Sequence, residues 1–459
     1  MRDVMSIGRR RWWLLAVVFA VGVPLLRAPW SSEGTATRVS AVGAGSSTAA
    51  DPGPCDQPAH WVAAWMAAPQ DTSALVPARG VDGDPTPETA RTSFTDQSFR
   101  MMVTPHIGGS GLRVRLSNRF GTDPVTFSAV HVARRQAGAA VVAGTDHVAT
   151  FDSGLAVTVA PGTDALSDPV DLAVDAFQDV AISFYVASSA SLDVHLDALQ
   201  TQYLTQPGAG DHTGDADGAA FDHPVLSWLA VAGVDVLASP SVGAVAVIGD
   251  SLTDGLGSTA DADARWPDDL ARRALVNGTP ISVLNGGISG NQVARDNLAS
   301  HGLQDRGAGL SAVNRLDADA LQQSGVRTVV VFAGINDLFS PSSADPVSAV
   351  VAGYEAIIDR AHAAGLRVVA ATLTPGSQNG AVEMWRLAIN NWIRTSGRFD
   401  SVLDLDAALR DPAHISRIAP GLTNEIVHFN DTGYRTLAAS IDLGALRASG
   451  CAGQADGVR

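Results

Sequence analysis

The chain has 459 residues, enough for two or three domains, and its content of 46% hydrophobic and 17% charged residues excludes a disordered chain. The net charge of −16 at pH 7 gives no electrostatic basis for binding nucleic acid. Every one of the 31 basic residues is arginine, which excludes a Schiff-base lysine, a pyridoxal-phosphate site, a phosphate-loop lysine and a Ser-Lys dyad.

The N-terminus carries the pattern of a secretory signal. Three arginines at 9–11 precede an apolar run from Trp12 to Leu26, which has the length of a signal-peptide h-region. The run is short for a membrane-spanning helix, and Arg27 follows it at once. We therefore expect a signal peptide over residues 1–41, a linker over 42–57 and a secreted protein with no stable membrane insertion after cleavage. An uncleaved membrane anchor is the alternative.

The chain has two cysteines, Cys55 and Cys451, near the two ends of the expected mature protein. Neither belongs to a Cys-x-x-Cys or another metal-binding spacing, so we expect no zinc. Two cysteines in an exported protein suggest a disulfide. We expect one between Cys55 and Cys451, and two unpaired cysteines are the alternative.

Residues 58–240 alternate between apolar and polar side chains with a period of two. Phe99–Pro105 and Leu112–Leu116 flank a glycine-rich turn, a pattern typical of a hairpin. Many short strands with Gly, Pro and Asp turns predict a jelly-roll-like β-sandwich as an accessory domain. It would bind carbohydrate, shape a substrate cleft or have a purely structural role. Further strands are expected at Val125–Ala133, Leu155–Val159, Val180–Val186, Leu192–Leu196 and Trp228–Leu237.

From residue 241 onward, apolar strands alternate with helical stretches. Five such units predict a doubly wound parallel sheet over residues 241–450, with a domain boundary at Ser239–Pro240. The expected strands are Ala244–Ile248, Ile281–Leu284, Thr328–Phe332, Arg367–Thr372 and Val402–Leu405. The expected helices lie near Trp266–Leu275, Pro346–Ala364 and Glu383–Thr395, with a last one after Asp431.

Polar residues follow these strands at the sheet edge where ligands bind in open α/β folds. Ser251 comes just after the first strand, in a tight turn. The loop Asn285–Asn291 follows the second strand, and its glycines let backbone N–H groups approach a ligand closely. Asn336 follows the third strand, and His428 stands just before the last helix.

These residue types suit acyl transfer. A serine hydroxyl is a weak nucleophile until a histidine takes its proton, and the oxyanion that forms needs hydrogen-bond donors fixed in advance. The backbone N–H groups of Ser251 and Gly290 and the Asn336 side-chain amide could supply three donors. The other ten histidines have no comparable neighbours. We interpret four further polar residues as braces of these loops: Asp250, Asp254, Asn291 and Asp337.

The α/β region resembles the GDSL family of SGNH hydrolases, and its motifs occur in the family's order. Gly249–Leu252 matches the first block, Ser289–Asn291 the second, Gly334–Asp337 the third and His428 the last. The resemblance implies an SGNH-type, flavodoxin-like sheet. A sandwich followed by this domain also resembles secreted bacterial GDSL-type esterases and lipases.

The resemblance also implies roles. Ser251 would be the nucleophile and His428 the general base and then acid. Ser251, Gly290 and Asn336 would form the oxyanion hole. The family usually has an aspartate three residues before the histidine, whereas this chain has Glu425. We expect Glu425 to orient His428, with a backbone carbonyl as the alternative.

The sequence therefore predicts a secreted serine esterase that needs no cofactor or metal. Its substrate would be a small-molecule, lipid or glycan ester, because the family cleaves short acyl esters, lipids, lysophospholipids and acetylated sugars. One alternative is an acyltransferase that uses the same residues. The other is a carbohydrate-binding protein with an inactive hydrolase domain, against which the four intact blocks argue.

Overall fold

The computed structural model describes residues 58–70, 93–297 and 308–446, which all belong to one compact unit. The expected signal peptide (1–41), the linker (42–57) and both cysteines lie outside the described residues. Among the residues described, no helix is long and apolar enough to cross a membrane. The domain boundary at Ser239–Pro240 stays a prediction.

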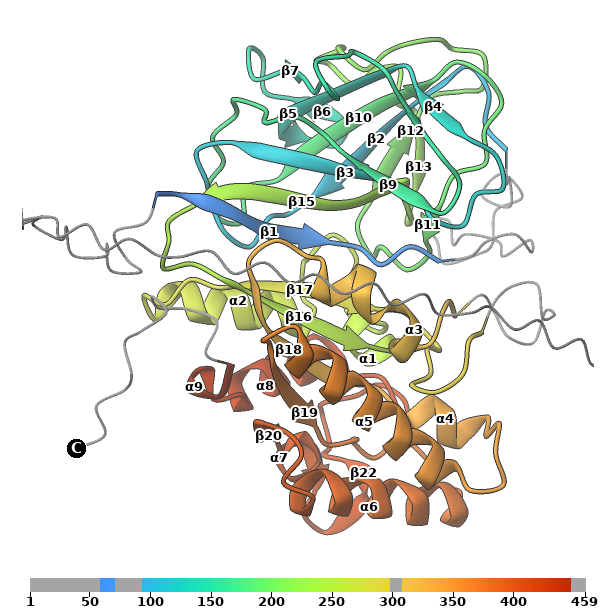
Figure 1. Cartoon of the computed structure of the whole chain (residues 1–459), viewed down its shortest axis with the longest axis vertical. Helices are drawn as coiled ribbons and strands as arrows, with labels where there is room; N and C mark the ends of the chain where they lie inside the picture. Colours follow the sequence, from blue (N-terminus) through green and yellow to red (C-terminus); the bar gives the residue numbers. More distant parts are fainter. Residues whose placement is uncertain (1–57, 71–92, 298–307, 447–459) are drawn as a thin grey trace, which may run out of the picture. The chain divides into compact units, whose positions relative to one another are not determined.

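The first half of the described chain is rich in strands, which form two main antiparallel sheets (Figure 1). One sheet has the order β1-β15-β3-β9, and the other has the order β13-β12-β2-β10-β5-β6 with β7 beside β5. Two shorter pairs are β4-β8 and β11-β14. The strands are β1 (His60–Met66), β2 (Gln97–Val103), β3 (Leu112–Asn118), β4 (Val125–Phe127), β5 (Ala129–Ala137), β6 (Ala140–Val141), β7 (His147–Val148), β8 (Val157–Val159), β9 (Thr163–Leu166), β10 (Val180–Val186), β11 (Val194–His195), β12 (Gln202–Leu204), β13 (His223–Val225), β14 (Trp228–Leu229) and β15 (Val231–Ala238).

The two sheets contribute side chains to one hydrophobic core. Phe99 of β2 stacks on Phe184 of β10 with ring centroids 4.8 Å apart. Val114 of β3 and Val234 of β15, from the other sheet, belong to the same buried cluster. Each sheet therefore buries its apolar positions against the other, which is the physical reason for the period of two in the sequence.

The predicted hairpin is wrong. Both of its strands exist, but β2 pairs with β10 and β12, whereas β3 pairs with β15 and β9. The glycine-rich segment between them carries the chain from one sheet to the other. Gly109 pairs with Val174, and a Cβ at Gly109 would lie 2.7 Å from Cβ of Val236. Glycine is therefore needed here for a close backbone approach rather than for a hairpin turn.

The second half confirms the predicted parallel sheet. Its five strands run parallel in the order β17-β16-β18-β19-β20, and β16 is buried at all six positions. The strands are β16 (Ala244–Gly249), β17 (Ser282–Gly287), β18 (Val326–Phe332), β19 (Arg367–Ala371) and β20 (Ser401–Leu403), with a separate antiparallel pair β21 (Arg410–Asp411) and β22 (His414–Ile418). The helices are α1 (Ser251–Asp254), α2 (Trp266–Val276), α3 (Ala312–Leu316), α4 (Ile335–Phe339), α5 (Pro346–Ala363), α6 (Gly380–Thr395), α7 (Leu405–Leu409), α8 (Asp431–Ser440) and α9 (Leu443–Leu446), and the π-helical turn η3 (Asp317–Leu321) follows α3.

The expected long helices form, and local side chains fix where three of them begin. Asp345 caps α5, which has a proline at its first position, and Asn379 caps α6. Asn430 caps α8 through a 3.0 Å bond from the Gly433 N–H. Side-chain oxygens at these caps accept N–H groups that have no partner within the helix. The Asn430 cap matters for function because it sets the position of His428, two residues earlier.

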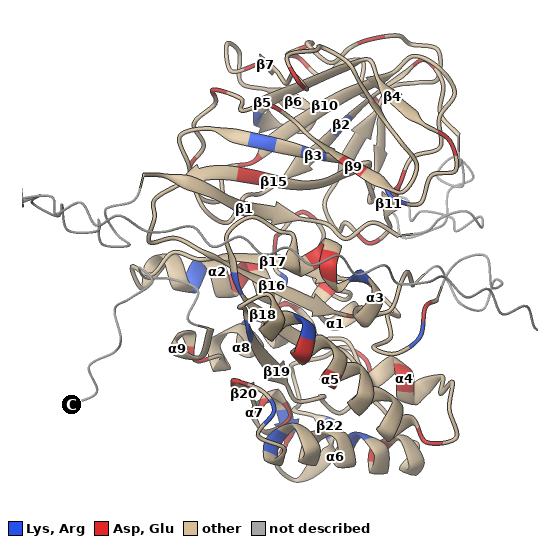
Figure 2. Ribbon diagram, viewed as in Figure 1, with Lys and Arg blue, Asp and Glu red and all other residues tan. Residues whose placement is uncertain are grey.

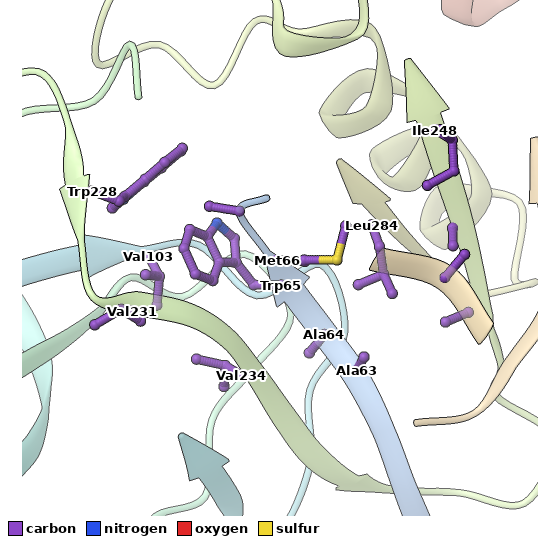
Figure 3. Packing of buried hydrophobic residues seen from close by; sticks show 14 of the residues in the cluster. Ala63, Ala64, Trp65, Met66, Val103, Trp228, Val231, Val234, Ile248 and Leu284 are labelled. Atoms are coloured by element: carbon purple, nitrogen blue, oxygen red, sulfur yellow. The ribbon is translucent and has the colours of Figure 1, made fainter. Parts of the chain in front are cut away.

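The β-rich region packs directly on the parallel sheet. Figure 3 shows Met66 extending from β1 toward Leu284 of β17, and both belong to one buried cluster with Ile248 of β16. A Cβ at Gly286 would lie 3.1 Å from Cε of Met66, so the glycine leaves room for β1. Nothing in the sequence analysis predicted β1, because burial of its last five residues removes the period of two.

Charged side chains add polar links between the sheets and across this contact. Figure 2 shows a basic segment on β3 beside an acidic one on β15, where Arg113 and Asp235 form a 2.6 Å ion pair. Ser324, which precedes β18, donates a 2.8 Å hydrogen bond to the same carboxylate. The buried aspartate thus bonds to both regions of the chain.

Candidate active site

The turn after β16 presents Ser251 at the carboxyl end of the strand. Asp250 caps α1 by accepting a 3.0 Å hydrogen bond from the Leu252 N–H, and Ser251 is the first helical residue. A Cβ at Gly249 would lie 2.1 Å from Oγ1 of Thr253, so only glycine lets the short helix turn back so tightly. Because the first N–H groups of a helix lack partners within it, the Ser251 N–H is available to an anion.

His428 reaches Ser251 from the loop before α8. Its Nε2 lies 2.9 Å from Oγ of Ser251, and its Nδ1 bonds to Oε1 of Glu425. The Thr423 hydroxyl accepts a 3.0 Å bond from the Glu425 N–H and donates to the His428 carbonyl, which fixes the loop between them. Phe429, fully buried, anchors the loop in the core below. Ser251 is 6% exposed, and the Glu425 side chain is 57% exposed.

The loop after β17 carries Gly290 and is bonded to both neighbouring site elements. Gly290 has φ +82°, a conformation that favours glycine. On one side, the Ser289 N–H and hydroxyl each donate a 2.9 Å bond to the Asp254 carboxylate of α1. On the other side, Nδ2 of Asn336 in α4 donates a 3.0 Å bond to the Asn291 carbonyl. The elements that hold Ser251, Gly290 and Asn336 are therefore joined by direct hydrogen bonds.

A buried arginine that the sequence analysis missed connects the same strand ends. Arg315 of α3 is 4% exposed. It donates to the carbonyls of Gly249 (2.8 Å) and Gly286 (2.6 Å), and to Oδ1 of Asn291 (3.0 Å). Asp319 of η3 balances its charge at 3.0 Å. No local motif marks this residue, because its partners lie at the ends of two distant strands and in the loop after β17.

The acidic residues interpreted as braces do brace these loops. Asp337 accepts hydrogen bonds from the Val293 and Ala294 N–H groups, at 2.9 and 3.2 Å. Burial raises the pKa of Asp250 to about 7 and that of Asp337 to about 6. The Leu252 N–H opposes the rise at Asp250, whereas the negative charge of Asp337 adds to it. Both carboxyls therefore ionise at a higher pH than an exposed aspartate does.

The described residues offer no cluster of three or more His, Cys, Asp or Glu side chains that could hold a metal ion. The elements of the site carry hydrogen-bond donors and acceptors: an imidazole, a carboxylate, a side-chain amide and backbone N–H groups. They can move a proton from a hydroxyl to an imidazole and stabilise an oxyanion. Together they provide the elements of serine-dependent acyl transfer.

The structure joins the predicted residues in two groups. Ser251, His428 and Glu425 form one hydrogen-bonded chain, in which Ser251 and Glu425 contact different nitrogens of the imidazole. Gly290 and Asn336 lie on elements joined to that chain through their neighbours. The arrangement places a hydroxyl, an imidazole and a carboxylate in hydrogen-bond contact at the carboxyl end of a parallel strand.

Residues 247–436 match the model of the GDSL-like Lipase/Acylhydrolase family, and this match supports a hydrolase of esters. A search of curated proteins finds no match to the chain.

Solved structures similar to the chain cover less than half of it. They include an acetyl xylan esterase, AlAXEase, at 19% identity, covering 43% of this chain and 96% of that one with a TM-score of 0.31. The lipase/acylhydrolase from Enterococcus faecalis is 18% identical over 43% of this chain and 92% of that one, with a TM-score of 0.32. A GDSL-like lipase from Bacteroides thetaiotaomicron is 15% identical over 45% and 88%, with a TM-score of 0.32.

Proposed function

We propose that the protein is a secreted serine esterase that hydrolyses carboxylic esters through an acyl-enzyme on Ser251. The observation that carries this proposal is the 2.9 Å contact between Oγ of Ser251 and Nε2 of His428. It gives the hydroxyl a base within reach at the carboxyl end of a parallel strand. The family match over residues 247–436 supports ester hydrolysis as the reaction.

In the first half of the proposed reaction, Ser251 Oγ attacks the ester carbonyl carbon while His428 Nε2 takes the hydroxyl proton. The tetrahedral intermediate collapses, His428 returns the proton to the leaving alkoxide, and the alcohol departs. In the second half, His428 takes a proton from water as the hydroxide attacks the acyl-enzyme. The acid leaves, and Ser251 recovers its proton. Glu425 orients the imidazole and stabilises its charged form.

The oxyanion hole of the proposed mechanism consists of the Ser251 N–H, the Gly290 N–H and the Asn336 amide. One N–H of Asn336 donates to the Asn291 carbonyl at 3.0 Å, which leaves the second N–H of the same amide to point elsewhere. The Asn291 bond holds the amide plane fixed. This preorganisation supports a donor role, because an oxyanion hole acts through dipoles that need no reorganisation.

The proposal also covers the type of the parallel sheet, the accessory domain, secretion and the disulfide. The strand order β17-β16-β18-β19-β20 supports a flavodoxin-like sheet, and two antiparallel sheets with a common core support a β-sandwich accessory domain. Secretion is proposed from the signal-peptide pattern in residues 1–41. A disulfide between Cys55 and Cys451 is proposed because the chain has two cysteines and is expected to be exported.

The test is hydrolysis of p-nitrophenyl acetate, butyrate and palmitate by the mature chain, with the Ser251→Ala variant alongside. We expect wild-type turnover on at least one ester and loss of it in the variant, and the chain-length profile narrows the substrate class. Release of free acid, rather than transfer of the acyl group to an added alcohol, separates an esterase from an acyltransferase. Turnover that survives in Ser251→Ala contradicts the mechanism. A wild type inert on these esters and on acetylated glycans contradicts the activity.

A further inference from the structure

A histidine from the β-rich region forms a buried pair with an aspartate of the candidate active site. His195 of β11 is 4% exposed, and its Nε2 lies 3.0 Å from Oδ1 of Asp254. Its Nδ1 lies 2.9 Å from the carbonyl oxygen of Ala68, just after β1. The ring packs beside Trp228, with centroids 5.5 Å apart. Asp254 stands at the end of α1, three residues after Ser251.

The partners of His195 decide its protonation. A backbone carbonyl can only accept a hydrogen bond, so Nδ1 of His195 must donate to Ala68. Oδ1 of Asp254 faces Nε2, and an ionised carboxylate can only accept a hydrogen bond. An imidazolium, with both nitrogens donating, therefore satisfies both contacts of the ring. Burial by itself lowers the pKa of His195, but the Asp254 carboxylate outweighs it and the pKa is raised above its usual value.

The same carboxylate holds the loop that carries a proposed oxyanion donor. While Oδ1 of Asp254 faces His195, Oδ2 accepts the Ser289 N–H and the Ser289 hydroxyl, each at 2.9 Å. Ser289 directly precedes Gly290. The Ser289 N–H belongs to the Ile288–Ser289 peptide plane and the hydroxyl to the Ser289 side chain, so the two bonds hold the Ser289 Cα in place. Only rotation about ψ of Ser289 then separates this fixed plane from the plane that carries the Gly290 N–H.

We propose that His195 is a positioning residue for catalysis: through Asp254 it fixes the Ser289–Gly290 segment and thereby aims the Gly290 N–H at the oxyanion. This inference rests on the proposed function. It gives the β-rich region a defined part in the active site, because without His195 the carboxylate that holds the loop loses its cation and its orientation. The region is then a component of the catalytic centre rather than a separate accessory module.

A second series of ion pairs ends at Asn291, which follows Gly290 in the same loop. Arg119, in the turn after β3, donates to Oδ1 of Asp319 at 2.9 Å, and Oδ2 of Asp319 pairs with Arg315 at 3.0 Å. Arg315 in turn donates to Oδ1 of Asn291. The residues on both sides of Gly290 are therefore tied, through buried ions, to the β-rich region.

Stability alone is a weak explanation for these ions. Buried ion pairs give up hydration, and well-packed apolar residues often replace them with no loss of stability. What an apolar contact lacks is direction, whereas hydrogen bonds to Asp254 fix the angle as well as the distance of the loop. A site that must hold an N–H toward a developing charge needs that direction.

The experiment compares His195→Gln and His195→Ala with two control variants, His106→Gln and His106→Ala, in the full mature chain. His106 is also a buried histidine of the β-rich region, and its Nε2 bonds to Asp268 of α2 at 2.9 Å. Its Nδ1 accepts from the Val283 N–H near the start of β17, away from the catalytic edge. A purely structural role predicts similar effects at both histidines, whereas positioning predicts an effect specific to His195.

Two readouts are measured: hydrogen exchange of the 286–291 segment by mass spectrometry, and kcat and KM on p-nitrophenyl acetate. We expect faster exchange of this segment in the His195 variants only. We also expect kcat to fall about tenfold to a hundredfold in His195→Ala, less than the 10²–10³ known for complete loss of an oxyanion donor, with KM within about twofold. His195→Gln keeps one donor for Asp254 and should lose less than His195→Ala.

Ser289→Ala tests the same hydrogen bonds from the side of the loop. This second variant is needed because His195→Ala leaves Asp254 buried without its cation, so that folding could fail. The Ser289 change removes one hydrogen bond from a partly exposed loop, and we expect faster exchange and lower kcat at unchanged melting temperature. Unchanged exchange in the folded His195 and Ser289 variants overturns the inference, as do equal losses of kcat in the His106 controls. If the wild type cleaves no ester, the proposed function fails, while exchange still decides whether His195 holds the loop.

Discussion

The carboxylate of Glu425 bonds to Nδ1 of His428 within the same short loop, only three residues away in sequence. The Glu425 side chain remains 57% exposed, whereas Ser251, on the other side of the imidazole, is 6% exposed. The imidazole therefore contacts an exposed carboxylate through Nδ1 and a buried hydroxyl through Nε2. Water screens the interaction of an exposed carboxylate with the imidazole more strongly than that of a buried carboxylate.

Glu425→Ala should consequently have a moderate effect. We expect kcat on p-nitrophenyl acetate to fall about tenfold to a hundredfold, compared with about 10⁴-fold when the buried aspartate of a triad becomes asparagine. Glu425→Gln should lose more than Glu425→Ala, because a glutamine amide can donate to Nδ1 and leave the proton on Nε2, where the base must be free. Wild-type kcat in Glu425→Ala would assign the orienting role to a backbone carbonyl.

Asn336→Ala should lower kcat by about 10²–10³ with little change in KM, since an oxyanion donor acts in the transition state more than on the bound ester. The side chain also donates to the Asn291 carbonyl, so melting temperature must be measured alongside kinetics. A fall in kcat at nearly unchanged melting temperature supports the donor role. Equal rates in wild type and variant would remove Asn336 from the mechanism.

Local sequence signals predicted much of the parallel sheet and the main site residues. The apolar run before Ser251 and the glycines around Gly290 correspond to a buried strand and to a loop with positive φ. Such signals work because each depends on neighbours within a few residues: burial on both faces, a turn, a helix cap. The match of Ser251 and His428 to known blocks then supplied the long-range pairing, since spacing by itself could not bring them together.

His195 and Arg315 show why the long-range contacts of the site could not be predicted from the sequence. His195 lies in a two-residue strand, and its partner Asp254 is 59 residues away. Arg315 reads as an ordinary polar residue of a short helix, yet it is buried and bonded to Gly249, 66 residues away. The role of such residues is defined by which strand ends meet in space, which no local period encodes. The wrong hairpin has the same origin, because β2 and β3 are adjacent in sequence but pair with distant strands.

Replacing Arg315 should destabilise the protein strongly. Arg315→Met keeps much of the side chain's volume but leaves Asp319 buried without this cation and the carbonyls of Gly249 and Gly286 without this donor. Removing one partner of a buried ion pair costs about 3–5 kcal/mol in other proteins, and we expect a loss of this order in urea unfolding. The control is Arg398→Met, which breaks the exposed pair with Asp359 and should change little. Similar losses in both variants would contradict the bracing role.

The buried carboxyl of Asp250 should make stability depend on pH in a defined direction. Its pKa is raised to about 7 by burial, from an ordinary value near 3.8 in the unfolded chain. The folded protein therefore favours the protonated form. This contribution to stability is fully present below about pH 4 and is lost as the pH rises through 7.

Asp250→Asn tests that direction, because asparagine stays neutral and keeps an oxygen that can accept the Leu252 N–H. We expect the stability of wild type, relative to the variant, to decrease between pH 4 and pH 8 by an amount on the order of 4 kcal/mol if the whole shift is realised. Urea unfolding across this range measures the decrease.

Asp345→Asn is the matched control. Asp345 also caps a helix, but its exposed carboxylate bonds to Ser348, which lowers the pKa of Asp345. The stabilisation by the Asp345 carboxylate is lost only as the pH falls below the ordinary pKa of an aspartate. The difference in unfolding free energy between that variant and wild type should therefore stay constant from pH 5 to pH 8. A wild-type stability that runs parallel to Asp250→Asn over the same range would mean that Asp250 is ionised in the folded protein, with more compensation from the charge of Arg315, which lowers the pKa of Asp250.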